Sequence, residues 1–225
     1  MSDDITIRVR EGGPYMVSGG APITRIRPLK SEHGESMTWV TTERLESRDI
    51  AALCRCGKSG RKPFCDGTHT TESFTGRETA PTNSYDERAK DYARDHLVVR
   101  DDRGICEHAG FCGNQATNVW KMVGPAEHDT TVRARMIAMI EHCPSGALTF
   151  REPGADTDIE PDLPMGVAVV DDGPLFVTGR IPVERADGQP FETRNRVTLC
   201  RCGASKNKPL CDGSHAETGF TDSSH

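Results

Sequence analysis

Aromatic residues and long apolar runs are both scarce in this sequence of 225 residues. Aromatic residues make up 5% of the chain and hydrophobic residues as a whole 35%. No apolar stretch approaches the roughly 20 residues that a membrane-spanning helix needs, so we expect no contact with a membrane. So little apolar material favours several small modules over one large hydrophobic core.

An excess of positive charge is also missing. The net charge is −6, which argues against a general nucleic-acid binder because such proteins need a basic surface. The first residues, Met-Ser-Asp-Asp-Ile, lack the basic and apolar regions of a secretory signal, so we expect a cytoplasmic protein. No phosphate-binding glycine loop, G-x-S-x-G turn or H-E-x-x-H helix occurs, and no nucleophile and base pair is identifiable. We therefore expect a protein that is not an enzyme.

Cysteine, in contrast, is abundant, with nine residues in the chain. An odd number cannot pair completely into disulfides, and clustered cysteines in a chain without a secretory signal indicate metal binding. The nine form three groups of three: Cys54, Cys56 and Cys65; Cys106, Cys112 and Cys143; and Cys200, Cys202 and Cys211. We therefore predict three metal centres.

The first and third groups belong to an internal repeat. The cysteines of the first group, together with His69 and Phe74, recur 146 positions later, with His215 and Phe220 as the counterparts. Upstream, the Gly-Pro turn and apolar run of residues 13–19 recur 160 positions later as residues 173–179. The two spacings differ by 14, so the first copy carries 14 extra residues, which we place in a surface loop within residues 24–49.

Each copy of the repeat has the pattern of a small β-rich unit. Apolar residues alternate along residues 5–9 and again at Val167 and Val169, and each run leads through the Gly-Pro turn into a second apolar run. Residues 50–53 and 196–199 predict a further strand directly before each group of cysteines. The predicted metal loop therefore lies at one end of the strands in both copies.

A module of a different kind separates the repeats. Residues 84–87 have a capping-box pattern, which predicts a helix that continues to about Asp95. A strand at 97–99, a helix at 131–141 and a final strand at 147–150 follow. Residues 152–172 contain many Pro, Gly, Asp and Glu residues but no Lys or Arg, which is typical of a solvated acidic linker.

Residues 54–69 and 200–215 share the pattern Cys-x-Cys-x2-Ser-x3-Pro-x-Cys-Asp-Gly-(Ser/Thr)-His. This pattern resembles the CDGSH (mitoNEET-like) iron–sulfur family, in which such a loop binds one 2Fe-2S cluster through three cysteines and one histidine. The resemblance implies two ligand sets: Cys54, Cys56, Cys65 and His69, and Cys200, Cys202, Cys211 and His215.

The donor spacing agrees with such clusters. Two cysteines one residue apart can bind one iron from a single loop, and a Cys and a His four residues apart suit one face of a helical turn. Asp66 and Asp212 fit the start of that turn as caps. Tetrahedral zinc is the alternative, although zinc sites usually use Cys-x2–4-Cys spacing and would be colourless.

The middle group, Cys106, Cys112 and Cys143, resembles a divergent single-cluster ferredoxin domain through its spacing and the run Cys-Pro-Ser-Gly-Ala-Leu. A bacterial ferredoxin loop reads Cys-x2-Cys-x2-Cys with a remote Cys-Pro, and here Ala109 occupies the second cysteine position. Three thiolates fit a 3Fe-4S cluster, whereas a 4Fe-4S cluster needs a ligand other than cysteine. His108 is the first candidate for that ligand and His142 the second.

Basic residues are frequent in both CDGSH loops. We interpret them as compensating the charge of anionic clusters, and they could also steer an acidic redox partner. They are Arg55, Lys58, Arg61 and Lys62 in the first loop, and Arg201, Lys206 and Lys208 in the second.

The predicted fold class is α+β, with two β-rich CDGSH units joined as an intramolecular pseudo-twofold dimer and a small ferredoxin-like module attached. Proteins with one CDGSH motif form homodimers, and one unit alone has too little apolar sequence for a stable core. Pairing the copies within the chain would leave it monomeric. The predicted parts are the N-terminal repeat (1–76), a linker and helix (77–94), the ferredoxin-like domain (95–152), an acidic linker (153–164) and the C-terminal repeat (165–225).

The predicted function is electron transfer by two 2Fe-2S centres and one 3Fe-4S or 4Fe-4S centre, with an unidentified redox partner protein. A cluster donor or a redox or pH sensor is the first alternative, because a single protonatable ligand makes a cluster releasable. A zinc-bearing structural module is the second.

Overall fold

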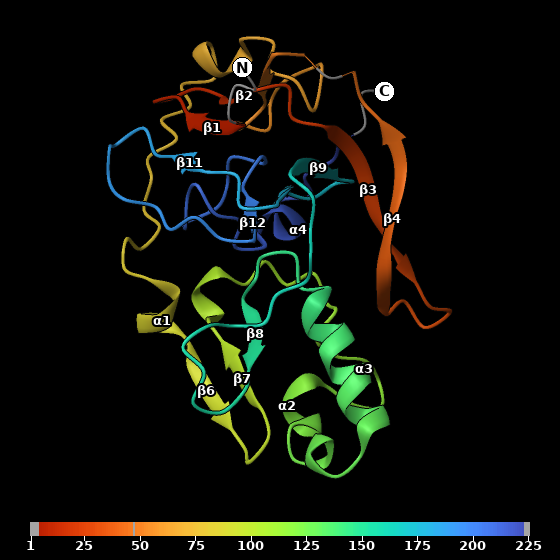
Figure 1. The fold of residues 1–225 in the computed structure, drawn as a ribbon. Coiled ribbons are helices and arrows are strands. Elements are labelled where there is room, and N and C mark those ends of the chain that lie inside the picture. Colours follow the sequence, from red (N-terminus) through yellow and green to blue (C-terminus); the bar gives the residue numbers. More distant parts are fainter. Residues whose placement is uncertain (1–4, 47, 223–225) are drawn as a thin grey trace.

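The computed structural model describes residues 5–46 and 48–222, so the outermost ends of the two predicted repeats lie outside the described residues. Two β-sheets stack above a smaller α+β module (Figure 1). The α+β class predicted from the sequence is confirmed. No helix in the described part of the chain combines the length and the apolar character needed to cross a bilayer.

The first sheet has the strand order β11-β1-β2-β5. Its strands have the alternating apolar positions that the sequence predicts, and those positions face the core, with Ile7, Tyr15 and Leu53 fully buried. The bounds are Thr6–Val9 (β1), Tyr15–Ser18 (β2), Ile50–Leu53 (β5) and Val183–Glu184 (β11).

The second sheet has the order β12-β10-β9-β3-β4. Three of its strands are the C-terminal counterparts of β1, β2 and β5, and they carry the buried residues Val169, Leu175 and Leu199. The bounds are Ile23–Lys30 (β3), Ser36–Arg44 (β4), Gly166–Val170 (β9), Leu175–Thr178 (β10) and Arg196–Leu199 (β12).

Each repeat places one strand in the sheet of the other. Strand β11 of the C-terminal repeat pairs in parallel with β1, where Ile7 lies opposite Val183. Strand β3 of the N-terminal repeat pairs in parallel with β9, where Ile23 lies opposite Val167. Ile7 and Val167 are counterparts 160 positions apart, and so are Ile23 and Val183, so the two contacts are the same contact made in opposite directions. The predicted intramolecular pseudo-twofold dimer is therefore confirmed.

The pseudo-twofold axis passes between the two metal loops. Cys56 and Cys202, which are counterparts in the repeat, form an isolated antiparallel β-bridge with each other. A Cβ atom added at Gly57 would lie 2.5 Å from the carbonyl oxygen of Cys202, and one at Gly203 would lie 2.5 Å from that of Cys56. Both glycines have a positive φ, so the two loops meet where only glycine allows the approach.

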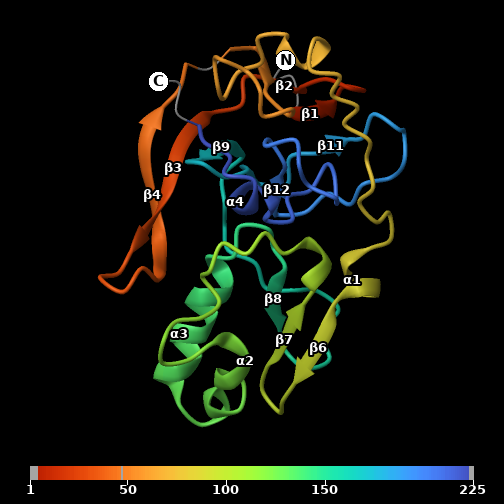
Figure 2. The ribbon, with the colours of Figure 1, turned by 180° about the vertical axis from the view of Figure 1, so that it is seen from behind.

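The 14 extra residues of the N-terminal repeat form a β-hairpin, not the surface loop that we predicted. Strands β3 and β4 pair over Thr24–Arg44, and the tip of their hairpin reaches the end of helix α3 (Thr130–Glu141) in the middle module (Figure 2). The Trp39 ring packs on Phe111, with 4.8 Å between ring centroids, and its Nε1 donates to the carbonyl oxygen of His142 at 3.2 Å. The insertion therefore attaches the middle module to the repeats.

The middle module combines a three-stranded sheet, in the order β6-β7-β8, with short helices. Its own hydrophobic core includes Val99, Val119, Met136 and Ile140. The helices and strands are Tyr85–Arg88 (α1), Lys90–Ala93 (β6), Val98–Asp101 (β7), Arg103–Ile105 (η2), Val119–Met122 (α2), Pro125–Glu127 (η3), Thr130–Glu141 (α3) and Leu148–Arg151 (β8).

Two predictions for this region are wrong. The Ser84 capping box is present, but α1 ends at Arg88 and the chain continues as strand β6, because that strand can pair with β7. Residues 152–172 are not simply a solvated linker either. Asp158 pairs with Arg100 at 3.1 Å and Glu160 with Arg196 at 3.1 Å, and β9 begins at Gly166. The domain boundaries remain predictions.

Candidate metal centres

The N-terminal loop brings its four predicted ligands together as two pairs. Cys54 and Cys56 directly follow strand β5, and their Sγ atoms lie 3.8 Å apart. Cys65 lies 3.3 Å, Sγ to Nδ1, from His69, which sits in the short 3-10 helix Thr68–Thr70 (η1).

The C-terminal loop repeats this geometry. The Sγ atoms of Cys200 and Cys202 lie 3.7 Å apart after strand β12. Cys211 Sγ lies 3.3 Å from Nδ1 of His215, which belongs to helix α4 (Ser214–Glu217). The same local sequence therefore forms the same arrangement twice.

These distances fit donors that share a metal. With metal–sulfur bonds of about 2.3 Å and tetrahedral angles, two thiolates on one metal lie about 3.8 Å apart, and a thiolate and an imidazole about 3.5 Å apart. Each loop supplies two such pairs, which matches one pair for each iron of a two-iron cluster. Among residues 5–46 and 48–222, no three His, Cys, Asp or Glu side chains are grouped as they would be around a single metal ion.

An aspartate braces each metal loop. Asp66 accepts hydrogen bonds from Thr68 N (3.1 Å) and from Gly60 N (2.8 Å) across the loop. Asp212 does the same with Ser214 N and Lys206 N. The Thr68 hydroxyl also donates to Asp66 at 2.7 Å, and this bond, followed by the two backbone contacts, lowers the pKa of Asp66 below its usual range. The predicted capping role is confirmed in part, because each aspartate stands one residue before the N-cap glycine and also closes the loop.

Serine and glycine complete each loop. The hydroxyls of Ser59 and Ser205 donate to the carbonyl oxygens of Phe64 and Leu210, each at 2.7 Å. Gly67 and Gly213, just before the helical turn with the histidine, have φ of 92° and 86°. The backbone that carries the predicted ligands is therefore fixed on both sides of the third cysteine.

The arginine between the first two cysteines of each loop is buried, so Arg55 and Arg201 are out of reach of a redox partner. Both are 1% exposed. The Arg55 guanidinium donates to Gly76 O, and that of Arg201 forms a two-bond pair with Asp222 at 2.6 and 2.8 Å. These arginines bind the chain that follows each loop.

The two CDGSH loops differ in how well they are covered. Cys211 is 1% exposed, whereas its counterpart Cys65 is half-buried. Burial raises the pKa of both thiols. Tyr15 adds a second difference, since its hydroxyl donates to the carbonyl oxygens of Cys200 (2.7 Å) and Pro209 (3.1 Å), and no hydroxyl is available from its counterpart, Leu175.

The three middle cysteines line one cavity of about 130 Å³. They come from distant parts of the chain, since Cys106 and Cys112 flank a loop after β7 and Cys143 follows helix α3. The carboxyl end of α3 places Cys143 beside Cys106 and Cys112 in this cavity. Burial raises the pKa of the Cys106 and Cys112 thiols. This arrangement agrees with the predicted third centre.

The two candidates for a fourth ligand lie in different surroundings. His108 lines the same cavity as the cysteines, and its backbone N–H donates to Cys106 Sγ at 3.4 Å. His142 faces another way, with Nε2 3.1 Å from Thr38 Oγ1 and Nδ1 2.5 Å from Ala138 O. With both nitrogens engaged, His142 is a poor candidate, and His108 remains the prediction.

Glu107 is a residue that sequence reasoning missed. Its side chain is 4% exposed and lies near Cys211, and its carbonyl oxygen meets Gly213 of the C-terminal loop, although Glu107 belongs to the middle loop. Burial raises the pKa of Glu107 to about 8, while the neighbouring Cys211 acts in the opposite direction. Nothing in the local sequence links position 107 to position 211, so only the fold could show this contact.

Comparison with known families agrees with this geometry. The family described as "Iron-binding zinc finger CDGSH type" matches residues 12–70 and 172–216. The family described as "Divergent 4Fe-4S mono-cluster" matches residues 92–153, between them. Comparisons with curated proteins and with solved structures gave no match. The chain therefore contains two CDGSH-type regions that flank a divergent 4Fe-4S mono-cluster domain.

Proposed function

We propose that this iron–sulfur protein is an electron carrier with three clusters and no catalytic activity of its own. The observation that carries the proposal is the pairing of donors in two equivalent loops, with a third set of cysteines around a separate cavity. Each CDGSH loop would hold a 2Fe-2S cluster, and the middle site a 4Fe-4S cluster, as its family description suggests, or a 3Fe-4S cluster. Such clusters accept and release single electrons.

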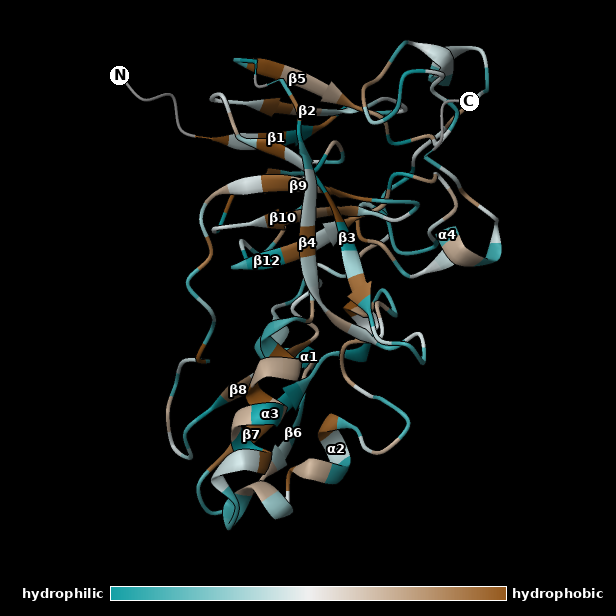
Figure 3. Cartoon of the chain, turned by 90° about the vertical axis from the view of Figure 1, so that its right-hand side faces the viewer, coloured by the Kyte–Doolittle hydropathy of each residue, from teal (hydrophilic) through white to brown (hydrophobic). Residues whose placement is uncertain are grey.

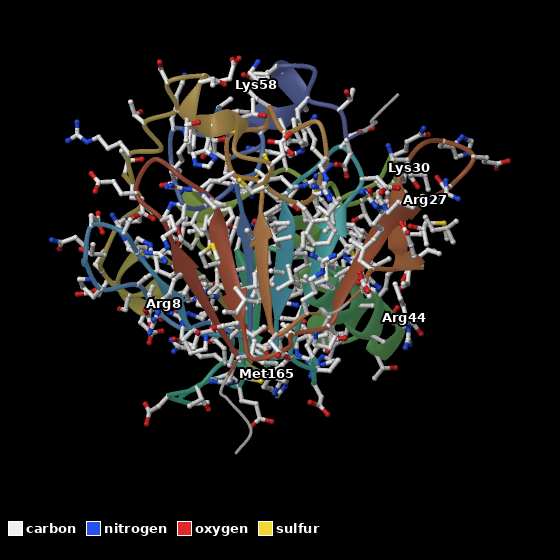
Figure 4. All side chains as sticks on the ribbon, turned by 90° about the horizontal axis from the view of Figure 1, so that it is seen from above. Arg8, Arg27, Lys30, Arg44, Lys58 and Met165 are labelled. Carbon is white, nitrogen blue, oxygen red and sulfur yellow. The ribbon has the colours of Figure 1, made fainter. Side chains whose placement is uncertain are left out.

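The residues of the chain would hold the clusters rigidly and admit a partner at one edge. Cys54, Cys56 and Cys200 are buried, which limits access of water to the inner half of each CDGSH site. Lys58 is exposed at the edge where the metal loops meet, whereas Arg27, Lys30 and Arg44 lie along the hairpin (Figure 4). An acidic one-electron carrier protein in the cytoplasm would fit the loop edge.

Metal analysis and electron paramagnetic resonance (EPR) test the proposal on the purified protein. We expect about eight irons per chain with a 4Fe-4S centre, or about seven with a 3Fe-4S centre, and about eight acid-labile sulfides in either case. An EPR signal in the air-oxidised protein would identify 3Fe-4S. Reduction and reoxidation should be repeatable without loss of the visible spectrum. A colourless protein that contains zinc would contradict the proposal.

A second candidate function is donation of an intact cluster. The half-buried pair of Cys65 and His69 favours this role because the outer iron of that site would be open to an acceptor. Incubation with an apo-ferredoxin separates the two functions. Stoichiometric transfer of clusters to the acceptor supports donation, and retention of all clusters through repeated redox cycles supports electron transfer.

A further inference from the structure

The C-terminal repeat lies between the N-terminal repeat and the middle module. Figure 3 shows the strands stacked from β5 through β1, β9 and β10 to β12, with the module beyond β12, and Figure 1 shows β1, β9 and β12 in the same order. Of the two CDGSH loops, the C-terminal one therefore stands nearer to the middle cysteines.

Direct contacts join the C-terminal metal loop to the middle metal loop. A Cβ atom at Gly213 would lie 3.1 Å from the carbonyl oxygen of Glu107 and 3.1 Å from the His108 ring. Glu107 is buried at this contact, and Asn207 Nδ2 donates to Gly104 O at 2.8 Å. The residue after one predicted ligand, Cys106, thus touches the ligand loop of the neighbouring centre.

The N-terminal metal loop lacks these contacts. A Cβ atom at Gly67, the counterpart of Gly213, would meet nothing within 4 Å among the described residues. The N-terminal repeat reaches the module through its hairpin, where Ser36 Oγ donates to Ala109 O at 3.0 Å, and the hairpin carries no predicted ligand. Its metal loop touches the C-terminal loop instead, through the bridge between Cys56 and Cys202.

We propose that the three centres form an ordered wire, in which the middle centre exchanges electrons with the C-terminal CDGSH centre and that centre with the N-terminal one. This inference rests on the proposed function. In each step one electron leaves one cluster and reduces the next, with no bond made or broken. The half-buried Cys65 and His69 make the N-terminal centre the end that a one-electron carrier protein reaches.

Contact between ligand loops sets the order because electron tunnelling weakens steeply with distance. From Cys106 the route to the C-terminal loop passes through one peptide unit to Glu107, whose carbonyl oxygen meets Gly213 two residues after Cys211. The route from the C-terminal loop to the N-terminal loop crosses the backbone contact of Cys56 with Cys202. The described residues offer no comparably short link between residues 106–112 and residues 54–69.

The magnetic interaction between reduced clusters tests the order. A paramagnetic middle cluster should speed the EPR relaxation of the C-terminal signal and leave the N-terminal signal unchanged. His69→Cys shifts the N-terminal signal and so separates the two. Removal of the middle cluster by Cys112→Ser should then make the C-terminal signal saturate at lower microwave power.

Gly213→Ala and Gly67→Ala are a matched pair of variants. Both force alanine into a left-handed conformation, but only the first pushes against Glu107 and His108. We expect the faster relaxation to be lost or reduced in Gly213→Ala and kept in Gly67→Ala. Two results in the protein with an intact middle cluster would overturn the proposed order of electron exchange. One is faster relaxation of the N-terminal signal, and the other is unchanged relaxation of both signals. Clusters that cannot be reduced reversibly would instead refute the proposed function.

Discussion

The arginine of each Cys-Arg-Cys sequence lies against an aromatic ring in the interior. The guanidinium carbon lies 5.6 Å from the Phe74 ring centroid for Arg55 and 5.1 Å from that of Phe220 for Arg201. Asp222, which pairs with Arg201, occupies the position equivalent to Gly76, whose carbonyl accepts from Arg55. Both arginines also reach the other kind of oxygen, since Arg201 donates to Val170 O at 2.6 Å and Arg55 lies 3.7 Å from the Glu78 carboxylate. The repeats therefore differ in how closely the arginine is paired with a carboxylate.

Replacement of Asp222 by Asn should cost about 3 kcal/mol of unfolding free energy at neutral pH, because it leaves a buried arginine without its charge partner. Burial alone would raise the pKa of Asp222, but Arg201 and Arg25 outweigh it and hold that pKa below its usual value. The ion pair therefore stabilises the protein above the unfolded pKa of about 4 and is lost as the pH falls through the lower folded pKa.

Urea unfolding of the wild type and of Asp222→Asn between pH 8 and pH 3 checks this prediction. The difference in stability should be constant at neutral pH and should shrink below about pH 4. Asp162→Asn, in the exposed acidic segment, serves as the control. If the difference in unfolding free energy between the wild type and Asp222→Asn grew on acidification, the assigned ion pair would be contradicted.

The histidine ligands should make the CDGSH clusters acid-labile, since only a neutral imidazole binds iron. We expect the N-terminal cluster to be lost first, because Cys65 is half-buried whereas Cys211 is covered. Stopped-flow absorbance after a drop in pH should show two phases. His69→Cys should slow the early phase and His215→Cys the late one. Unchanged decay in both variants would mean that histidine is not the weak ligand.

At the scale of elements, the hairpin β3–β4 does more than lengthen a sheet. Trp39 packs on Phe111, which precedes Cys112, and on Phe176 of strand β10, with 5.8 Å between those ring centroids. Thr38 and Trp39 also contact His142, which precedes Cys143. The hairpin therefore supports two of the three middle cysteines from outside the module.

Trp39→Ala should destabilise the protein by roughly 2–3 kcal/mol, somewhat less than the loss of a fully buried tryptophan. Hydrogen exchange should become faster in residues 109–112 and 142–145 and remain unchanged in the N-terminal metal loop. Val40→Ala, at an exposed position of the same strand, is the matched control. If residues 109–112 and 142–145 exchanged hydrogen at the same rate in Trp39→Ala and Val40→Ala, the hairpin would not stabilise the module.

The strands of the repeats were predictable because several have a buried face with period two, and the spacings of 160 and 146 residues identified the counterparts. The metal loops were predictable because the donors lie close together in sequence. The hairpin was not, because its apolar residues are few and Trp39 gains its partners only from residues 111 and 176. The contact of Glu107 with Cys211 was hidden for the same reason, since it depends on docking of distant loops.

At the scale of the whole molecule, the internal dimer satisfies the contact that a protein with one motif obtains from a second chain. Ile7 with Val183 and Ile23 with Val167 close both sheets within one chain. We predict a monomer of 24.6 kDa by light scattering at concentrations up to the millimolar range. Light scattering that gave twice this mass, with the CDGSH clusters intact, would contradict the prediction.

The bridge of Cys56 with Cys202 has a consequence for how the protein can change. In a homodimer, one codon specifies both sides of the axis, so every substitution appears twice and must suit both surroundings. Here two codons specify the two sides, and Tyr15 can hold Cys200 while Leu175 remains apolar. Each cluster site can therefore acquire its own potential and its own neighbours by separate mutations, without mispaired assemblies ever forming in the cell.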